Sequence, residues 1–158
     1  MNNLPESTIC TEKKNTAKPL WLTQFMAVYQ QLSTDNLALL KTIYHQDIHF
    51  VDPMHEIQGL DDLCQYFKGL YENVFSCEFT INHVVVQENE AAIYWCMRYC
   101  HPKLNKGNVI MVDGHSHIKS TADKIIYHRD YLDLGEMLYE HLPLLGKVTQ
   151  WIKARAAK

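Results

Sequence analysis

The chain has 158 residues, of which 47% are hydrophobic and 21% are charged, which is typical of one soluble globular domain. Its formal net charge of -3, without a long basic segment, argues against a nucleic-acid partner. No apolar segment approaches the roughly 20 residues needed to cross a bilayer, so stable membrane insertion is not expected. The polar N-terminus lacks the apolar region of a signal peptide, and the five cysteines include no C-x-x-C pair. These features predict a cytoplasmic protein.

The first third of the chain predicts a disordered segment, two helices and a strand. Residues 1–17 are polar and have little to bury, so we expect them to be disordered. A helix should begin near Lys18 and Pro19, because proline is favoured early in a helix and apolar residues recur at helical spacing afterwards. Residues 33–36 (STDN) should end it and begin a short second helix that includes Tyr44. Residues 47–52 then predict a strand.

The middle of the chain predicts a third helix and an antiparallel sheet. Residues 59–62 should open the helix, which carries an apolar face of Leu63, Tyr66, Phe67 and Leu70. The apolar period then changes to two, which predicts strands over residues 77–87, 91–101, 108–119 and 124–133. Because the connections between the last strands are short, these strands should be antiparallel neighbours.

The tail returns to helical spacing and predicts a C-terminal helical extension over residues 135–158, in which Pro143 and Gly146 should separate two pieces. We expect this extension to cap the sheet or to pack on a partner subunit. Helices segregated from antiparallel strands predict an α+β fold, with a main domain over residues 18–134. A curved sheet wrapped around the N-terminal helices would form a cone whose interior can hold a ligand.

Two segments, IYHQDIHFVDPMHEIQGLDDLCQYF and KIIYHRDYLD, carry a family resemblance in this order of elements. Residues 19–145 resemble the nuclear-transport-factor-2-like superfamily and are most similar to its SnoaL-like polyketide cyclase and steroid isomerase-like branch. The resemblance implies a cone-shaped barrel with a deep hydrophobic pocket, and often a homodimer formed by the outer sheet faces. It does not fix the function, because members include isomerases, cyclases, epoxide hydrolases, dehydratases and non-catalytic binding domains.

Asp52 and Tyr29 are the first candidate site residues. Asp52 ends a predicted strand and precedes a proline, so it either caps a turn or faces the pocket as a base. By resemblance, its position is similar to the catalytic aspartate of the steroid isomerases, and a desolvated carboxylate there would be a better base. Tyr29 lies near the position of their oxyanion-hole tyrosine and could donate to an enolate, but its spacing also fits a core aromatic residue.

His115 is a further candidate, because it falls near the position of the isomerases' second oxyanion donor. A histidine departs from that pattern and leaves an acid-base role open. Asp113, His115 and His117 alternate and should therefore point to one sheet face. His115 and His117, with Asp113 or His128 as a third ligand, would also allow a metal site. The simplest alternative is a set of polar residues on the face away from the core.

Arg98 lies in an apolar strand and should reach solvent or pair with a carboxylate, for which Asp130 is the natural partner. The pair resembles the Arg and Asp positions of the limonene epoxide hydrolases, in which the Asp holds the reacting water. Asp52 resembles the position of an asparagine that also holds this water in that family. Their second catalytic acid corresponds here to Cys100, so epoxide hydrolysis is not predicted. A structural ion pair between Arg98 and Asp130 is the alternative.

These candidates predict three functions. The first is a cofactor-independent isomerase, cyclase or lyase for a small apolar carbonyl-bearing molecule, with Asp52 as base, Tyr29 and His115 polarising the substrate, and Arg98 with Asp130 orienting it. The second is a non-catalytic small-ligand-binding or protein-interaction module of the same fold. The third is a metal-dependent hydrolase or lyase that uses His115 and His117. The first is favoured because several ionisable side chains should point at one cavity.

Overall fold

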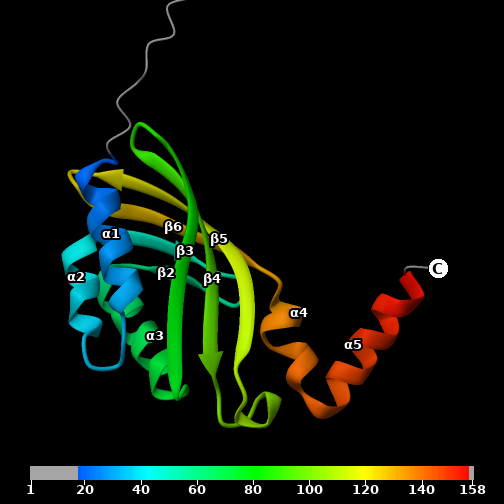
Figure 1. The fold of residues 1–158 in the computed structure, drawn as a ribbon. Coiled ribbons are helices and arrows are strands. Elements are labelled where there is room, and N and C mark those ends of the chain that lie inside the picture. Colours follow the sequence, from blue (N-terminus) through cyan, green and yellow to red (C-terminus); the bar gives the residue numbers. More distant parts are fainter. Residues whose placement is uncertain (1–17, 157–158) are drawn as a thin grey trace, which may run out of the picture.

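The sheet wraps around the N-terminal helices, so that α1, α2 and α3 cover its concave face (Figure 1). This computed structural model describes residues 18–156, and the predicted disorder of residues 1–17 lies outside the described part of the chain. The predicted α+β fold is confirmed, with a six-stranded sheet in the order β2-β1-β6-β5-β4-β3.

Three helices form the layer inside the sheet. α1 (Leu20–Gln31) begins after Pro19, whose extended backbone makes it the N-terminal cap. α2 (Leu40–Ile43) follows a single 3-10 turn, η1 (Leu37–Leu39), and ends one residue before the expected position, because Tyr44 already begins a strand. α3 (Leu60–Glu72) starts after Gly59, whose φ of 92° favours glycine, and two aspartates in its first turn complement the helix dipole.

The predicted antiparallel run of four strands is confirmed: it comprises β3 (Ser76–Gln87), β4 (Glu90–Cys100), β5 (Ile110–Thr121) and β6 (Lys124–Leu132). The earlier strand, β1 (Tyr44–Val51), pairs in parallel with β6 and lies beside the short β2 (Glu56–Gln58), which the sequence pattern did not predict. Register shifts in the β3–β4 and β5–β6 pairs mark bulges that increase the curvature of the sheet.

The core lies between the concave sheet face and the helices. Along β4 every second residue is buried: Ala91, Ile93, Trp95, Met97 and Tyr99. The same alternation buries Ile110, Val112, Ser116 and Ile118 on β5. The intervening residues of both strands therefore face away from the helices, which decides where several predicted site residues point.

The C-terminal segment consists of α4 (Leu134–Met137), the 3-10 turn η3 (Tyr139–His141) and α5 (Pro143–Ala156). The predicted extension is helical, but only Pro143 begins a new helix. Gly146 lies inside α5, where it allows the helix to approach the Glu140 carbonyl so closely that a Cβ atom would overlap with it. α5 points away from the sheet (Figure 1) and exposes apolar residues, including Leu144 and Trp151. None of the helices within residues 18–156 is long and apolar enough to cross a membrane.

Candidate active-site cavity

A cavity of about 80 Å³ lies between the helices and the concave sheet face, and two carboxylates reach it. Asp52 follows β1, and Asp130 lies near the end of β6. Aromatic side chains supply much of the remaining wall: Tyr29, Phe50, Phe67, Phe79 and Trp95. Two acids in a small, aromatic cavity form the kind of site expected for acid-base chemistry on an apolar molecule.

This inner cavity adjoins a larger outer cavity of about 240 Å³. The outer cavity lies between the end of α3, the start of β3, the end of β4 and α4. Five residues line both cavities: Met54, Leu70, Phe79, Met97 and Met137. Because three of the five are methionines, whose unbranched side chains adapt easily, the junction can change its width around a ligand.

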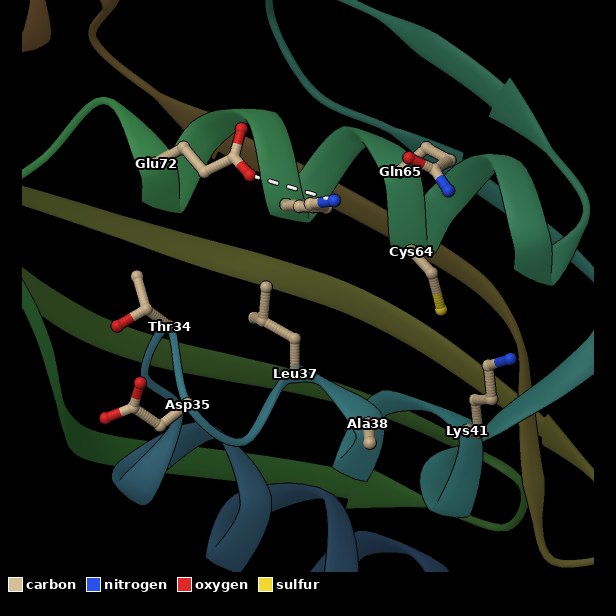
Figure 2. Close-up of a pocket in the computed structure, with 9 residues that line it drawn as sticks. Thr34, Asp35, Leu37, Ala38, Lys41, Cys64, Gln65 and Glu72 are labelled. Atoms are coloured by element: carbon tan, nitrogen blue, oxygen red, sulfur yellow. Dashed lines mark ion pairs between the residues drawn. The ribbon is translucent and has the colours of Figure 1, made fainter.

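A larger hollow lies elsewhere, between α3 and the segment 34–41 (Figure 2). It measures about 440 Å³ and is open to solvent on the outer side of the helical layer. Lys68 and Glu72 form an ion pair of 3.8 Å across one turn of α3 at its edge. Most of its lining residues are exposed, and none of the predicted site residues lines it. We therefore place the candidate site in the inner cavity.

Asp130 is anchored through one of its two carboxylate oxygens. Oδ1 accepts hydrogen bonds from Ser116 Oγ at 2.5 Å and from His128 Nε2 at 2.8 Å. The Ser116 hydroxyl is in turn fixed by the Trp95 indole N–H, 2.8 Å away. No residue in the described part of the chain hydrogen-bonds to Oδ2, and the side chain is 18% exposed. Asp130 is thus a fixed carboxylate with one oxygen available to a ligand.

Behind Asp130, a chain of hydrogen bonds runs through the core and returns to the cavity. His128 is completely buried, and its Nδ1 atom lies 2.6 Å from the Tyr44 hydroxyl. The Tyr44 hydroxyl lies 2.5 Å from the Tyr29 hydroxyl. Tyr29 and Asp130 both line the inner cavity. The two ends of the chain Tyr29–Tyr44–His128–Asp130 therefore lie at the same cavity.

One proton arrangement satisfies every member of this chain with a neutral imidazole. Tyr29 donates to Tyr44, Tyr44 donates to the unprotonated Nδ1 of His128, and the Nε2–H group donates to Asp130. In the reverse direction, Nδ1 carries a proton and donates to Tyr44, which donates to Tyr29 and releases the Tyr29 O–H for a ligand. The direction of these hydrogen bonds therefore decides whether Tyr29 is a donor to the cavity.

Both tyrosines of the chain keep their protons over the physiological pH range. Burial, followed by the mutual proximity of the two phenols, raises the pKa of Tyr29 well above the usual value for a phenol. Burial also raises the pKa of Tyr44, although the hydrogen bond with Tyr29 acts in the opposite direction. Since neither ionises, both act as hydrogen-bond donors and acceptors.

Asp52 combines the two roles that its sequence position allowed. Its Oδ1 atom accepts the backbone N–H groups of Met54 and His55, each at 2.7 Å, and thereby closes the turn between β1 and β2. Its Oδ2 atom accepts the hydroxyl of Tyr66, whose own pKa is raised above its usual range by burial and by this carboxylate. Asp52 lines the cavity, but both of its oxygens already hold structural hydrogen bonds.

His115 and Arg98 do not reach the cavity, contrary to the expectation for both. His115 lies on the outer face of β5, where its ring stacks between Tyr94 and Tyr131 at centroid distances of 5.4 and 4.8 Å. Arg98 is exposed on the outer face of β4, and the predicted ion pair with Asp130 is absent from the ion pairs of residues 18–156. Successive residues of a strand point to opposite faces, and Arg98 falls at an outward position of β4, whereas Asp130 lies on the inner face of the sheet.

The residues of the predicted metal site are also divided between the two sheet faces. His117 pairs with Glu90 at 3.0 Å on the outer face, whereas His128 is inside the core. Within the described chain, no group of three His, Cys, Asp or Glu side chains is arranged to hold a metal ion. The site proposed for His115 and His117 is therefore not formed by these side chains.

Four functional candidates were not predicted in their roles: His128, Tyr44, Ser116 and Trp95. The sequence does indicate that Ser116 faces inward, because every second residue of β5 from Ile110 to Ile118 is small or apolar. It does not indicate this for His128, because the bulge in β6 interrupts the alternation just before that residue.

Comparison with protein families gives a match between residues 23–128 and the SnoaL-like domain model. The chain belongs to this family. The matched region contains Tyr29, Tyr44, Asp52 and His128, and it ends two residues before Asp130. A comparison of this SnoaL-like chain with curated proteins found no match.

Solved structures support the same fold for the SnoaL-like domain. A protein from Jannaschia sp. CCS1 described as a SnoaL-like polyketide cyclase superposes with a TM-score of 0.67 at 9% identity, covering 75% of this chain and 88% of that chain. A protein from Catenulispora acidiphila described as having a ketosteroid isomerase-like fold, solved with trimethylamine, gives a TM-score of 0.68 at 16% identity, covering 80% of this chain and 96% of that chain. A protein from Shewanella putrefaciens, also described as a SnoaL-like polyketide cyclase, gives a TM-score of 0.65 at 15% identity, covering 77% and 95%.

Proposed function

We propose that this SnoaL-like protein is a cofactor-independent enzyme that transfers a proton on a small, apolar, carbonyl-bearing molecule, as in isomerisation or cyclisation. The observation that carries the proposal is the geometry of Asp130. One oxygen is held by Ser116 and His128, while the other faces an aromatic cavity without a hydrogen bond from the described residues. A base that is fixed in position and only partly solvated suits proton abstraction next to a carbonyl.

Asp130 replaces Asp52 as the proposed base, because the hydrogen bonds of the two acids differ. Asp52 would have to give up a turn hydrogen bond or the Tyr66 hydrogen bond to bind a proton. We assign Asp52 the role of shaping the cavity floor, through the turn that it closes and its hydrogen bond with Tyr66. The described polyketide cyclases of the same fold support a reaction of this class.

Tyr29 is the proposed partner for the substrate oxygen. Proton abstraction by Asp130 leaves a negative charge on the carbonyl oxygen, which a neighbouring O–H donor stabilises. Tyr29 can donate when the hydrogen-bond chain runs from His128 towards the cavity. The chain therefore connects the base to the oxyanion donor through the core of the protein.

Deuterium incorporation at carbon tests this proposal without knowledge of the natural substrate. A bicyclic apolar ketone, 2-tetralone, is incubated in D2O with the protein, and loss of its α-proton signals is followed by NMR. Asp130→Asn should reduce the enzyme-dependent exchange rate by about 100-fold or more. Asp52→Asn is the matched control and should retain most of the rate. Full exchange by a folded Asp130→Asn variant would exclude Asp130 as the base.

A non-catalytic interaction module is the second candidate, and the exposed apolar side of α5 favours it. Leu144 is 82% exposed and Trp151 is 60% exposed. A chain ending after Leu142 should keep the inner cavity, since the only part of the C-terminal segment among its lining residues is α4, with Leu134 and Met137. If that chain loses self-association or partner binding but not ketone exchange, α5 is an interaction element rather than part of the site.

Two other expectations from the sequence remain predictions. We propose a homodimer through the outer sheet face, where the Tyr94, His115 and Tyr131 rings stack in a row. Sedimentation equilibrium tests it, and a Tyr131→Glu variant should be monomeric. We propose a reducing, cytoplasmic location on the basis of the free thiols of Cys64, Cys77, Cys96 and Cys100, and imaging of a tagged chain would check it.

A further inference from the structure

The hydroxyl group of Tyr71 is buried and has no hydrogen-bond partner within residues 18–156. The residue is 6% exposed and lies on the face of α3 that packs against the sheet, together with Leu63 and Phe67. Its ring stacks on the Phe67 ring at a centroid distance of 6.4 Å, which fixes its direction. Folded proteins keep few buried hydroxyl groups unpaired, so a partner from outside the chain is a reasonable explanation.

The surroundings of Tyr71 explain why the chain itself does not satisfy this hydroxyl. Burial raises the pKa of Tyr71 above its usual range, and the nearby Cys77 thiol adds to the shift. Burial likewise raises the pKa of Cys77 to about 11, so that the thiol stays neutral. The Cys77 thiol is close enough to the hydroxyl to influence its pKa, but a thiol is a weak acceptor and the contact does not have the geometry of a hydrogen bond.

Tyr71 lines the outer cavity, which is otherwise built mainly from apolar side chains. These include Leu70, Val74, Phe79, Met97 and Leu104. An apolar cavity of about 240 Å³ with one unpaired donor in its wall suits a flat or compact apolar group that carries one acceptor oxygen. Because five residues line both cavities, and three of these are flexible methionines, one elongated molecule can reach from one cavity into the other where these side chains move aside.

We propose that the outer cavity binds the non-reacting part of the substrate and that the Tyr71 hydroxyl donates a hydrogen bond to a ketone, ether or phenol oxygen on it. The substrate class is then an elongated, uncharged, apolar molecule with two oxygen functions, one beside Asp130 and one beside Tyr71. The placement of the reacting end rests on the proposed function, whereas binding at Tyr71 does not. Tyr71 is in this role a specificity-determining residue.

Two probes of the same shape test the hydrogen bond. 2-Acetylnaphthalene carries a ketone oxygen, and 2-isopropenylnaphthalene carries a CH2 group in its place. Isothermal titration calorimetry of the full chain should show that the ketone binds roughly fivefold more tightly than the alkene, as expected for one neutral hydrogen bond. Tyr71→Phe should bind both with equal affinity, because it keeps the ring and removes only the donor. Equal binding of the two probes by the unmodified protein, or no binding of either, would overturn the proposal.

Thermal unfolding of the same variant provides an independent readout. Since the hydroxyl has no partner in the ligand-free chain, Tyr71→Phe should unfold at the same or a higher temperature. A decrease of several degrees would show that the hydroxyl is already satisfied and would also overturn the proposal. Asp130→Asn separates the two proposals: it should lose ketone exchange but keep the ketone preference. If only Tyr71→Phe loses the preference for the ketone probe, and no form of the protein catalyses ketone exchange, the ligand site at Tyr71 is supported and the proposed enzyme activity is not.

Discussion

His128 and Asp130 lie two residues apart on the inner face of β6, and Nε2 of the imidazole is 2.8 Å from Oδ1 of the carboxylate. The imidazole is completely buried, whereas the carboxylate is 18% exposed at the cavity. The pair therefore connects the surface of the cavity to the centre of the core. A substitution of His128 in the core should therefore change the position and hydrogen bonding of the Asp130 carboxylate at the cavity.

Coupling within the buried chain can be measured by a double-mutant cycle of Tyr44→Phe and His128→Phe. His128→Phe alone leaves the Tyr44 hydroxyl without its acceptor and should lower the free energy of unfolding by about 2–4 kcal/mol. The double variant should lose less than the sum of the single losses, by roughly 0.5–3 kcal/mol, because the two residues share one hydrogen bond. Urea unfolding gives the four values, and strict additivity would contradict the buried chain.

Gly114 and Gly69 form a matched pair of glycine substitutions. The indole ring of Trp95 lies against Gly114, and a methyl group there would overlap with three ring atoms. Gly114→Ala should therefore cost about 1–3 kcal/mol and displace the ring that lines the inner cavity. Gly69→Ala, on α3 in open space, should stabilise the protein by roughly 0.5–1 kcal/mol. Thermal unfolding compares them, and a neutral Gly114→Ala variant would show that Trp95 has room to move.

The turn role of Asp52 predicts a difference between two substitutions. Asp52→Ala removes the acceptor of the Met54 and His55 N–H groups and should lower the free energy of unfolding by about 1–2 kcal/mol. Asp52→Asn keeps one carbonyl oxygen for the same turn and should lose much less. Denaturant unfolding measures both free energies. An equal decrease for the two variants would indicate that Asp52 stabilises the protein through its charge rather than through the turn hydrogen bonds.

Asp133 should make the C-terminal segment sensitive to acid. The backbone N–H of Glu136, then that of Gly135, and the Lys153 ammonium hold its pKa below the usual 3.8. A carboxyl whose pKa is lower in the folded state stabilises it above the unfolded pKa, and this contribution is lost as the pH falls through the folded value. The docking of α4 and α5 should therefore be intact near neutral pH and weaken below 3.8.

NMR titration of the Gly135 and Glu136 amide signals checks this dependence, with a midpoint expected below 3.8. Asp133→Asn provides the control: it should show no step in this range, and its α4 segment should be less protected from hydrogen exchange at neutral pH. A midpoint at or above 3.8 in the unmodified protein would be inconsistent with Asp133 as the cap of α4.

Local patterns predicted most of the fold but missed the elements that depend on tertiary contacts. The apolar period of two placed the four antiparallel strands, because one face of each is buried in the core. Tyr44 was expected in a helix, but its hydroxyl bonds to His128 and Tyr29 from the start of β1. The strand β2 has only three residues and depends on the Asp52 turn, so no periodic signal marks it.

The site was predictable only where the inner and outer strand faces differ in polarity. Asp52, Tyr29 and Asp130 line the inner cavity, and their roles there remain predictions. On β4, both faces carry apolar residues in the segment around Tyr94 and Trp95, so the sequence does not show that Arg98 points outward. Hydrogen-bond partners across the sheet depend on register, which the bulges change.

The parallel pairing of β1 with β6 brings Asp52 and Asp130 to one cavity, because Val51 lies opposite Arg129 in the register. The two acids come from the first and the last long strands, so the pairing of β1 with β6 joins the two strands of the sheet that lie farthest apart in the sequence among its neighbouring pairs. Contacts of such high sequence separation form slowly, after the local hairpins. In a refolding experiment, the recovery of ligand binding should therefore lag behind the recovery of sheet structure and report when β1 and β6 join.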